Sequence, residues 1–341
     1  MSEIKVSIVV PTFRRPSVLR ETLESLSNLN YPPRNYEVIV VDDGSNDETP
    51  EVVEPFREKI SNLIYHYQEN SGVATARNRG AKLASGEVLI FNDDDIVVEP
   101  NLIERHLANL DEFGKCVVNG HWEFPPTMTE YFDQTPFGRY RTATEVWVKA
   151  VNDKKQIAGN IYESQTVSAC NCGVRREDFW QIGGYDEQFP FAGFEDHEFC
   201  LRAAKAGYRF VYDYGIKLWH NDHRINFEQF GERQRRGAIT KVLLATKYPH
   251  EEAEHPMIVE NNFRKPGEPV KRSAKKMVKS VLANPGVSEI VFTAIRLLES
   301  KWKTNVLLPR LYNVACGIYI FRGIRQGIER YGEPNLDIND R

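Results

Sequence analysis

The first hundred residues alternate short β-branched apolar runs with segments whose apolar residues recur at helical spacing. Four runs have the length and composition of strands, at residues 6–10, 36–41, 63–67 and 88–91. Helical spacing covers three segments, at residues 18–26, 49–60 and 73–84. Strands that alternate with helices predict an α/β fold, with a mostly parallel sheet covered by helices on both faces.

Polar residues follow three of these strands. Thr12 and Arg14 follow the first strand, the Asp42-Asp43 pair follows the second, and the run Asp93–Asp95 follows the fourth. In open α/β sheets, ligands bind beyond the carboxyl ends of the strands. Neither the glycine fingerprint of dinucleotide-binding folds nor a P-loop is present. The pattern therefore predicts a ligand site at this edge that is neither a conventional dinucleotide site nor a P-loop site.

The pattern changes twice further along the chain. Residues 115–170 are irregular and rich in aromatic residues, which either line a binding wall or pack the loops down: Trp122, Phe124, Tyr131, Phe132, Phe137, Tyr140 and Trp147. Residues 226–341 return to helical spacing, with one expected apolar stripe: Ile290, Val291, Ala294, Ile295 and Leu298. We therefore expect an α/β domain at residues 1–225, followed by a helical region at residues 226–341.

Charge is divided between the two ends of the 341-residue chain. The net charge of -4 is made up of -7 over residues 1–100, -5 over residues 101–263 and +8 over residues 264–341. Residues 264–280 hold seven basic residues against the single acid Glu268. This basic segment predicts contact with an anionic membrane surface or, equally, a solvated helix packed on the α/β domain. Nucleic-acid binding is disfavoured because no recognised module accompanies the charge.

The cysteine count and the apolar runs bear on location. Five cysteines, an odd number, favour a reducing compartment over a disulfide framework. The apolar run at residues 6–10 is too short for the core of a signal peptide, and Leu311–Phe321 is shorter than the ~20 residues that span a bilayer. We expect a cytoplasmic protein, with a peripheral position on the inner face of the membrane if the basic segment contacts lipid.

Two acidic clusters suggest chemistry. The carboxylates of Asp93–Asp95 repel one another at the end of a buried strand, so a cation is needed beside them. Oxygen ligands suit Mg2+ or Mn2+ bound to a substrate phosphate, although a solvated acidic turn is the alternative. Glu195 and Asp196 precede a helix whose expected core face holds Phe199, Leu201, Ala204 and Ala206. The positive end of that helix would stabilise an ionised general base, although Asp196 could simply cap the helix.

Six short motifs occur in an order and spacing that resemble one family. They are Val10-Pro11-Thr12-Phe13, Val41-Asp42-Asp43-Gly44-Ser45, Ala76-Arg77-Asn78, Phe91-Asn92-Asp93-Asp94-Asp95, Gly183-Gly184-Tyr185-Asp186-Glu187 and Glu195-Asp196. Over residues 4–222 the chain resembles the family 2 glycosyltransferases, which have the GT-A fold. The resemblance implies an inverting transfer from a nucleotide-diphosphate sugar, a UDP-sugar being favoured. It also divides the catalytic domain into a donor-binding half at 1–115 and an acceptor half at 116–225.

The resemblance also implies roles for individual residues. The donor nucleotide would be contacted by Pro11, Thr12, Arg14, Asp43, Arg77 and Asp94. The metal would be held by Asp93, Asp95 and His220, the first two being the ends of a D-x-D motif. Asp196, with Glu195 beside it, would be catalytic as the general base. The acceptor would be contacted by Asn171, Cys172, Gly184 and Trp219.

Two departures and two alternatives accompany this interpretation. Cys172 stands where relatives often have a hydrophobic residue near the acceptor. Gln234–Gly237 only partly matches the Gln-x-x-Arg-Trp motif of processive polysaccharide synthases, because glycine replaces the tryptophan. We therefore expect transfer of one sugar, to a glycan, lipid-linked or other acceptor in polysaccharide biosynthesis. One alternative is a phosphohydrolase of the haloacid dehalogenase type, because Asp93–Val97 satisfies its D-x-D-x-V pattern. The other is a catalytically silent module that binds a sugar nucleotide or glycan.

Overall fold

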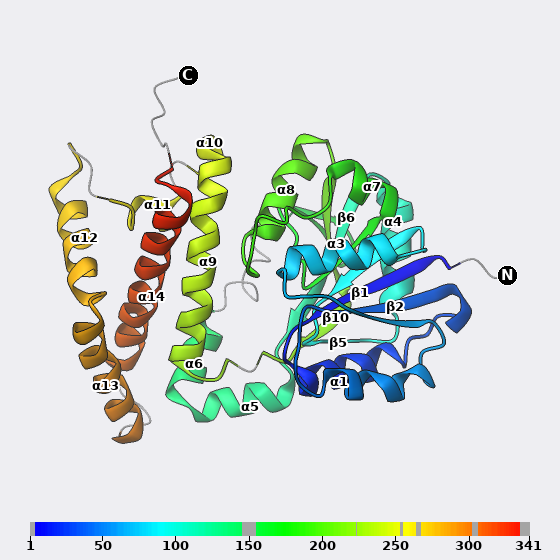
Figure 1. The fold of residues 1–341 in the computed structure, drawn as a ribbon, viewed down its shortest axis with the longest axis horizontal. Coiled ribbons are helices and arrows are strands. Elements are labelled where there is room, and N and C mark those ends of the chain that lie inside the picture. The colour runs from blue at the N-terminus through cyan, green and yellow to red at the C-terminus, as the bar shows by residue number, and fades with distance from the viewer. Residues whose placement is uncertain are drawn as a thin grey trace. The chain divides into compact units, whose positions relative to one another are not determined.

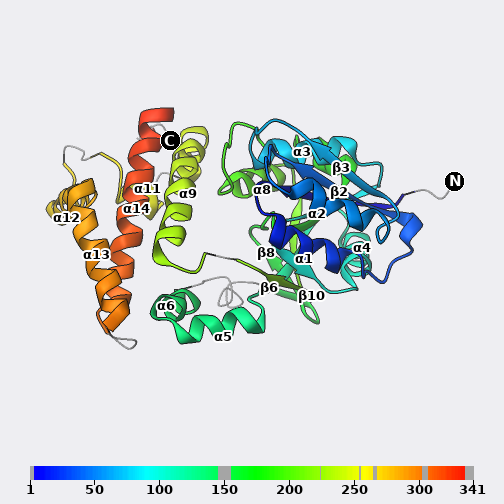
Figure 2. The same cartoon turned by 60° about the horizontal axis from the view of Figure 1, so that its bottom comes forward.

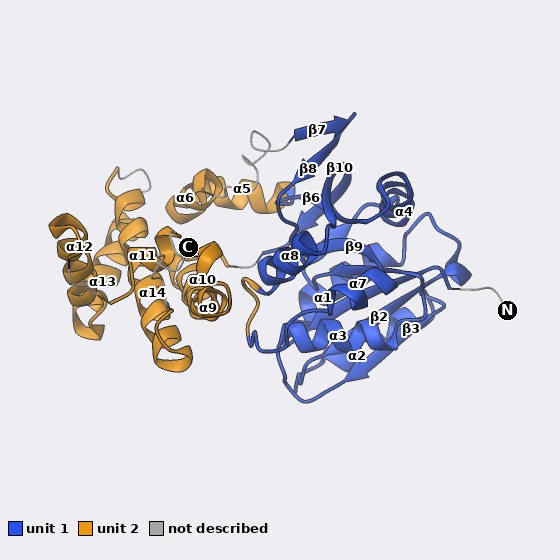
Figure 3. Ribbon diagram, turned by 90° about the horizontal axis from the view of Figure 1, so that it is seen from above, with its two compact units in different colours: residues 1–125, 147–190, 195–222 blue, residues 126–146, 191–194, 223–341 orange. Residues whose placement is uncertain are grey.

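The structure is a computed structural model that describes residues 4–144, 155–222, 224–252, 255–263, 267–301 and 306–334. The chain forms two compact units, coloured separately in Figure 3. Unit 1 comprises residues 1–125, 147–190 and 195–222, and unit 2 comprises residues 126–146, 191–194 and 223–341. Trp147 and the first three residues of the basic segment, 264–266, lie outside the described residues.

Four parallel strands form the N-terminal half of the sheet in unit 1, in the order β3-β2-β1-β4. They are β1 (Val6–Thr12), β2 (Tyr36–Asp42), β3 (Leu63–Tyr67) and β4 (Val88–Asn92). These are the four strands that the apolar runs predict. Because β1, β2 and β4 are buried along their whole length, each is mainly apolar rather than alternating between apolar and polar residues.

Helices cover both faces of this half-sheet, as Figure 1 shows for α1 and α3. On one face, the core formed by alternate residues of β1 is closed by α1 (Pro16–Leu26), α2 (Thr49–Val53) and α4 (Leu102–Phe113). The other face is covered by α3 (Val73–Leu83), α7 (Arg176–Ile182) and α8 (Glu195–Lys205). The helix expected at 49–60 is shorter, since a 3-10 turn containing Pro55 follows α2 at Glu54–Arg57.

Beyond β4 the sheet becomes mixed. Among the described residues ten strands form one sheet, which continues from β4 in the order β9-β6-β10-β8-β7, with β5 beside β10. The added strands are β5 (Ile96–Val98), β6 (Cys116–Glu123), β7 (Lys155–Ala158), β8 (Ile161–Ser164), β9 (Asn171–Arg175) and β10 (Arg209–His220). β9 runs antiparallel to both β4 and β6. The expectation of an irregular 115–170 segment was therefore wrong.

Unit 2 is helical. Its helices are α5 (Pro126–Gln134), α6 (Pro136–Thr144), α9 (Phe227–Lys247), α10 (Pro249–Glu252), α11 (Pro256–Val259), α12 (Val270–Leu282), α13 (Pro285–Lys301) and α14 (Leu308–Tyr331). Phe137 and Tyr140 of α6 pack in one core with Phe227 and Tyr312. This is why residues 126–144 group with the C-terminal helices, whereas the sequence analysis assigned them to the acceptor half.

One expected helix face was largely confirmed, and another was placed wrongly. Of the stripe expected on α13, Ile295 is buried, and Val291 and Leu298 pack against the same core. Ile290 is the exception at 71% exposed, and Phe292 is buried in addition. On α8 the buried apolar residues are Phe199, Cys200 and Ala203, whereas Leu201 and Ala204 are not buried. On α8, apolar residues next to the true face satisfied the helical spacing equally well.

The aromatic residues between 115 and 144 mainly serve as packing. Phe124, Phe132, Phe137 and Tyr140 are buried, while Tyr131 is exposed.

None of the described helices is by itself long and apolar enough to cross a membrane. Helices α12 and α13, which meet at an 82° bend, are long and apolar enough only when taken together.

Helices α9 and α14 run side by side in unit 2 (Figure 2). Glycines permit this close approach. A Cβ at Gly323 of α14 would lie 2.3 Å from the carbonyl oxygen of Arg235, and one at Gly327 would lie 2.8 Å from the Val242 side chain. Nothing lies within 4 Å of a Cβ at Gly317, which is on the same helix.

We predict opposite effects of alanine at two positions of α14. Gly323→Ala forces the helices apart and lowers the free energy of unfolding by about 1–3 kcal/mol. Gly317→Ala, the matched control, leaves it unchanged or raises it by up to ~1 kcal/mol because alanine favours the helix. Urea denaturation followed by circular dichroism measures both values. Equal effects of the two substitutions would contradict the proposed close contact.

Candidate active site

The acidic run Asp93–Asp95 forms the turn between β4 and β5 at the carboxyl edge of the sheet. Its backbone is held from several sides. The Asp93 amide donates to the carbonyl of Cys170 (2.9 Å), the Thr22 hydroxyl donates to the carbonyl of Asp94 (2.8 Å), and the Asn221 amide donates to the carbonyl of Asp95 (2.8 Å). The three carboxylates are therefore aimed by a fixed backbone.

Arg15 provides the main positive charge for two of these carboxylates. Its guanidinium donates to Asp94 Oδ1 (2.7 Å) and to Asp95 Oδ2 (2.5 Å), and the Thr12 hydroxyl donates to Asp94 Oδ2 (2.8 Å). Arg14, which the sequence analysis chose, is exposed, and its backbone amide donates to Ser45 Oγ (2.8 Å). The arginine pair was visible in the sequence, but its pattern did not show which arginine turns inward.

The environments of the two carboxylates differ. Burial raises the pKa of Asp94 to about 7, although Arg15 acts to lower it. Burial alone would also raise the pKa of Asp95, but His220 and Arg15 hold it below its ordinary value. Asp95 is therefore the more firmly ionised of the two and the better anionic ligand.

Asp95 and His220 lie together, as a shared metal site requires. His220 Nε2 is 3.4 Å from Asp95 Oδ2, because β10 pairs with β5 in a register that sets His220 opposite Ile96. Two adjacent ligands of an octahedral Mg2+ ion lie roughly 3 Å apart, so this pair fits such an ion. Within the described part of the chain, no group of three or more His, Cys, Asp or Glu residues could hold a metal. Phosphate oxygens and waters would therefore have to complete the coordination.

Asp93 has a different partner. Its Oδ1 accepts a 2.7 Å bond from Arg77 of α3, whose guanidinium also donates to Glu195 Oε1 at 2.9 Å. The Arg77 side chain is only 2% exposed. Burial alone would lower its pKa, but Asp93 and Glu195 raise it well above the ordinary value. Arg77 thus binds one oxygen of Asp93, and the pairing of Asp93 with Asp95 on one ion stays a prediction.

The acidic pair at the start of α8 divides into two roles. Glu195 is buried against Arg77, which holds its carboxylate in place. Asp196 is partly exposed, and its Oδ1 accepts a 2.8 Å bond from the His197 amide. Burial, with the charge of Glu195, raises the pKa of Asp196 to about 6, against the opposing effect of Arg77. Such a carboxylate is ionised at neutral pH and is a stronger base than an ordinary aspartate.

Asp43 holds the loop in front of α3. Its Oδ1 accepts from Gln68 Nε2 (2.8 Å) and its Oδ2 accepts from the Gly72 amide (2.9 Å), while its own amide donates to the carbonyl of Thr12 (2.9 Å). Pro11 lies buried at the end of β1. The carboxylate of Asp43 is therefore already occupied, and a nucleotide base would have to share it or displace Gln68.

Two of the residues expected to contact an acceptor lie inside the protein. Asn171 is fully buried, where it bonds His106 Nε2 and Asn92 Oδ1, each at 2.9 Å. Cys172 is 1% exposed, with its sulfur 3.5 Å from the Tyr185 hydroxyl. Both belong to β9, which lies between β4 and β6 in the interior of the sheet. The structure therefore removes these two side chains from the acceptor site.

The other two acceptor candidates differ from each other. Gly184 is buried at a φ of +67°, and a Cβ there would lie 2.9 Å from Asn78 Oδ1, so glycine is needed for the turn itself. Trp219 of β10 is half-buried beside His220 and stays available for a ligand contact.

Comparison with known proteins identifies the family. The family model described as "Glycosyl transferase family 2" matches residues 7–183. The chain belongs to this family. A second model, described as "N-terminal domain of galactosyltransferase", matches residues 156–221 and so covers Asp196 and His220. Because family 2 membership explains the acidic turn, the haloacid dehalogenase alternative is no longer needed to explain it.

Curated relatives of this family 2 chain carry glycosyltransferase names. It is 28% identical over 258 residues to validoxylamine A glucosyltransferase of Streptomyces hygroscopicus subsp. limoneus, covering 70% of this chain and 54% of that one. It is 28% identical over 212 residues to glycosyltransferase AglE of Haloferax volcanii, covering 62% of this chain and 65% of that one. The chain thus spans between half and two thirds of the length of these two relatives.

The fold is also shared with solved structures. A mannosyltransferase of Pyrobaculum calidifontis, solved in complex with GDP-Man and Mn2+, aligns over 97% of this chain and 89% of that one, with a TM-score of 0.59 at 15% identity. The mixed α/β sheet with its helical covers is the GT-A fold, as the sequence analysis expected.

We predict that Arg77 is essential to the stability of unit 1. Arg77→Met leaves two buried carboxylates without their cation and lowers the free energy of unfolding by about 3–5 kcal/mol. Arg57→Met removes an exposed ion pair with Glu54 and serves as the control, with a loss below about 1 kcal/mol. Urea denaturation measures both, and similar losses for the two variants would refute the central role of Arg77.

Proposed function

We propose that this family 2 protein is an inverting, metal-dependent transferase that moves one sugar from a nucleotide-diphosphate sugar to a hydroxyl of a glycan or lipid-linked acceptor. The observation that carries the proposal is the partly exposed Asp196 carboxylate, with its raised pKa, anchored through Glu195 and Arg77 to the acidic turn. The names of the relatives support sugar transfer, and the mannosyltransferase complex supports a nucleotide sugar with a divalent metal.

The donor diphosphate is proposed to lie over the acidic turn. Asp95 and His220 would hold Mn2+ or Mg2+, which, when bound, offsets the negative charge that develops on the leaving diphosphate. Arg15, whose side chain is 38% exposed, can add a second positive charge from the same side. A UDP-sugar stays the favoured donor, with GDP-sugars as the alternative that the mannosyltransferase complex suggests.

The acceptor half of the reaction is assigned to Asp196. Its ionised carboxylate would take the proton from the acceptor hydroxyl as that oxygen attacks the anomeric carbon. Attack from the side opposite the diphosphate inverts the anomeric configuration. Glu195 keeps Asp196 in place through Arg77 and does not itself exchange a proton with the substrate.

We also propose that the protein works in the cytoplasm. All five cysteines, Cys116, Cys170, Cys172, Cys200 and Cys316, are free thiols, as a reducing compartment allows. A donor nucleotide sugar and a peripheral position on the inner face of the membrane are compatible with this location.

Turnover distinguishes this proposal from a silent binding module. The purified chain is incubated with UDP-sugars and GDP-sugars, each with Mn2+ or Mg2+, and release of the nucleoside diphosphate is measured. A transferase releases diphosphate in a metal-dependent manner from at least one donor. Binding of a donor without release, with or without a mixture of glycan and lipid-linked acceptors, would instead favour the silent module.

We predict that Asp196→Asn separates binding from chemistry. Donor affinity stays within about twofold because the amide keeps the shape of the carboxylate, while kcat falls by about 10²–10⁴ because the base is lost. Isothermal titration measures donor binding, and a coupled diphosphate assay measures kcat. Asp186→Asn, in a neighbouring partly exposed turn, is the matched control and retains kcat. Unchanged transfer in Asp196→Asn would remove Asp196 from its role.

We predict that activity falls on the acid side. Since Asp196 must be deprotonated to accept a proton and its pKa is raised to about 6, kcat/KM rises with pH and levels off above that value. Below it, kcat/KM falls about tenfold per pH unit. A profile of kcat/KM against pH at saturating metal measures the inflection. An acid limb near the ordinary value for aspartate, about 4, would contradict the assignment.

We predict that His220 and Asp95 set the metal requirement. Asp95→Asn and His220→Ala each remove one ligand of the ion. Each therefore raises the Mn2+ concentration needed for half-maximal activity by tenfold or more, which corresponds to a loss in metal-binding free energy on the order of 1.4 kcal/mol or larger. His121→Ala, which changes a histidine that pairs with Glu123 on β6, leaves the requirement unchanged. Identical metal titrations for all three variants would exclude the proposed site.

A further inference from the structure

Helix α12 in unit 2 presents an apolar row to solvent. Val270, Met277, Val278 and Val281 are 85%, 60%, 58% and 62% exposed. Their spacing of seven, eight and eleven residues from the first places them on one side of the helix. An ordinary surface helix of a globular protein turns such a row toward the core, so this helix has its amphipathic face reversed.

Polar contacts on the inner side keep the helix in this orientation. Ser273 and Lys276 are buried. Lys276 Nζ donates to Asn262 Oδ1 (2.6 Å) and is paired with the carboxylate of Glu268, to which the Ser273 hydroxyl also donates (3.2 Å). Rotating α12 to bury its apolar row would expose this network and break its bonds. The outward position of the row is thus part of the folded structure.

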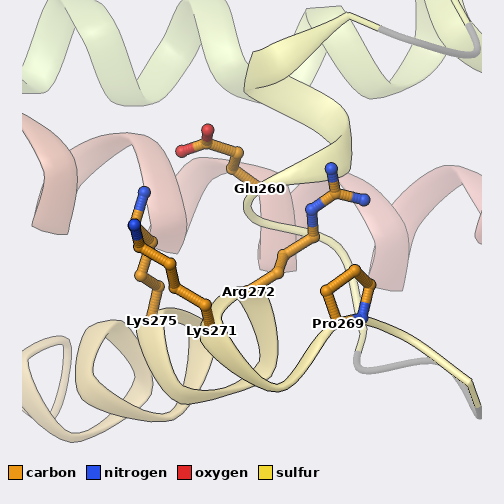
Figure 4. Close-up of a pocket in the computed structure, with 5 residues that line it drawn as sticks. All are labelled: Glu260, Pro269, Lys271, Arg272 and Lys275. Carbon is orange, nitrogen blue, oxygen red and sulfur yellow. The ribbon is translucent and has the colours of Figure 1, made fainter.

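A basic pocket borders the apolar row. It has a volume of about 280 Å3 and is lined by Lys271, Arg272 and Lys275 of α12 together with Glu260 and Pro269 (Figure 4). The three basic side chains form no hydrogen bond or close ion pair with any residue that the structure describes, although Arg272 is near enough to Glu268 to help lower its pKa. Glu260 has its own cation, since its carboxylate lies 3.7 Å from Lys279. The pocket therefore carries excess positive charge and suits a phosphate group.

The row and the pocket adjoin each other on the helix. Lys271 precedes Lys275 by four residues and Val278 by seven, so by helical spacing all three lie along the same side. An apolar strip flanked by basic residues is the arrangement of helices that lie in the interface of a lipid bilayer. Two copies of this face would repel through their basic residues, which disfavours self-association as the reason for the exposed row.

We propose that this face of α12 docks on a membrane surface that contains anionic lipid. The apolar row enters the boundary between headgroups and acyl chains, and the basic pocket takes a headgroup phosphate. Docking does not require sugar transfer. It rests on the proposed function only in bringing the catalytic unit to the surface where a lipid-linked acceptor would lie.

The test is flotation of the full-length chain with vesicles of phosphatidylcholine alone or mixed with phosphatidylglycerol. The wild-type protein binds the mixed vesicles and not the neutral ones. The double variant Lys271→Ala/Lys275→Ala weakens this binding by about 25-fold, at roughly fivefold for each charge. The double variant Val278→Ser/Val281→Ser weakens it by about tenfold or more, because less apolar area enters the bilayer.

Matched controls keep the test independent of folding and of catalysis. Lys82→Ala changes an exposed lysine of α3, and Val306→Ser changes an exposed valine outside α12; both bind as wild type. Circular dichroism confirms that each variant is folded, as expected for changes at exposed positions. Asp196→Asn also binds as wild type, so failure of transfer and failure of docking are seen separately.

Three outcomes would overturn the proposal. The first is equal binding to neutral and anionic vesicles, or binding to neither. The second is unchanged binding by either double variant. The third is a wild-type dimer in sedimentation velocity that becomes a monomer in Val278→Ser/Val281→Ser, because a second copy would then be the occupant of the row.

Discussion

The guanidinium of Arg77 is buried between two carboxylates that come from distant parts of the chain. One belongs to Asp93 in the turn after β4, and the other to Glu195, which is 118 residues away from Arg77 in sequence. A buried arginine without these partners would be strongly destabilising, so α3, the acidic turn and the start of α8 are forced to one place. Asp196 follows Glu195 directly, and its position depends on the same contact.

The other charged side chains at this edge of the sheet leave no excess of positive charge. Arg15 sets one positive charge against the two carboxylates of Asp94 and Asp95, and His220 lies against Asp95. A nucleotide sugar brings two phosphate charges, and a divalent ion with Arg15 is the available compensation. The proposed chemistry thus follows from charge balance around the acidic turn, while the reversed face of α12 concerns the second unit and a different partner.

Periodicity served well where local sequence and tertiary environment agree. The buried runs of β1, β2 and β4 are mainly apolar, and their strands were predicted close to their observed ends. It failed for β6, a partly polar strand paired with residues far away in sequence, and for β7, β8 and β9, which are only four or five residues long. Arg14 and Arg15 could not be told apart either, since the direction of each side chain is decided by the backbone after β1 and the start of α1.

The amino-acid sequence by itself determined the family, the N-terminal half-sheet and the clusters that carry the chemistry, because these are local runs whose residue types have few alternatives. Tertiary structure decided which of those residues are accessible. Asn171 and Cys172 are buried because β9 is an interior strand, whereas Asp196 is left partly open beside the buried Glu195. It also decided that α12 turns its apolar side outward, since the burial of Lys276 with Glu268 depends on contacts that no helical pattern records.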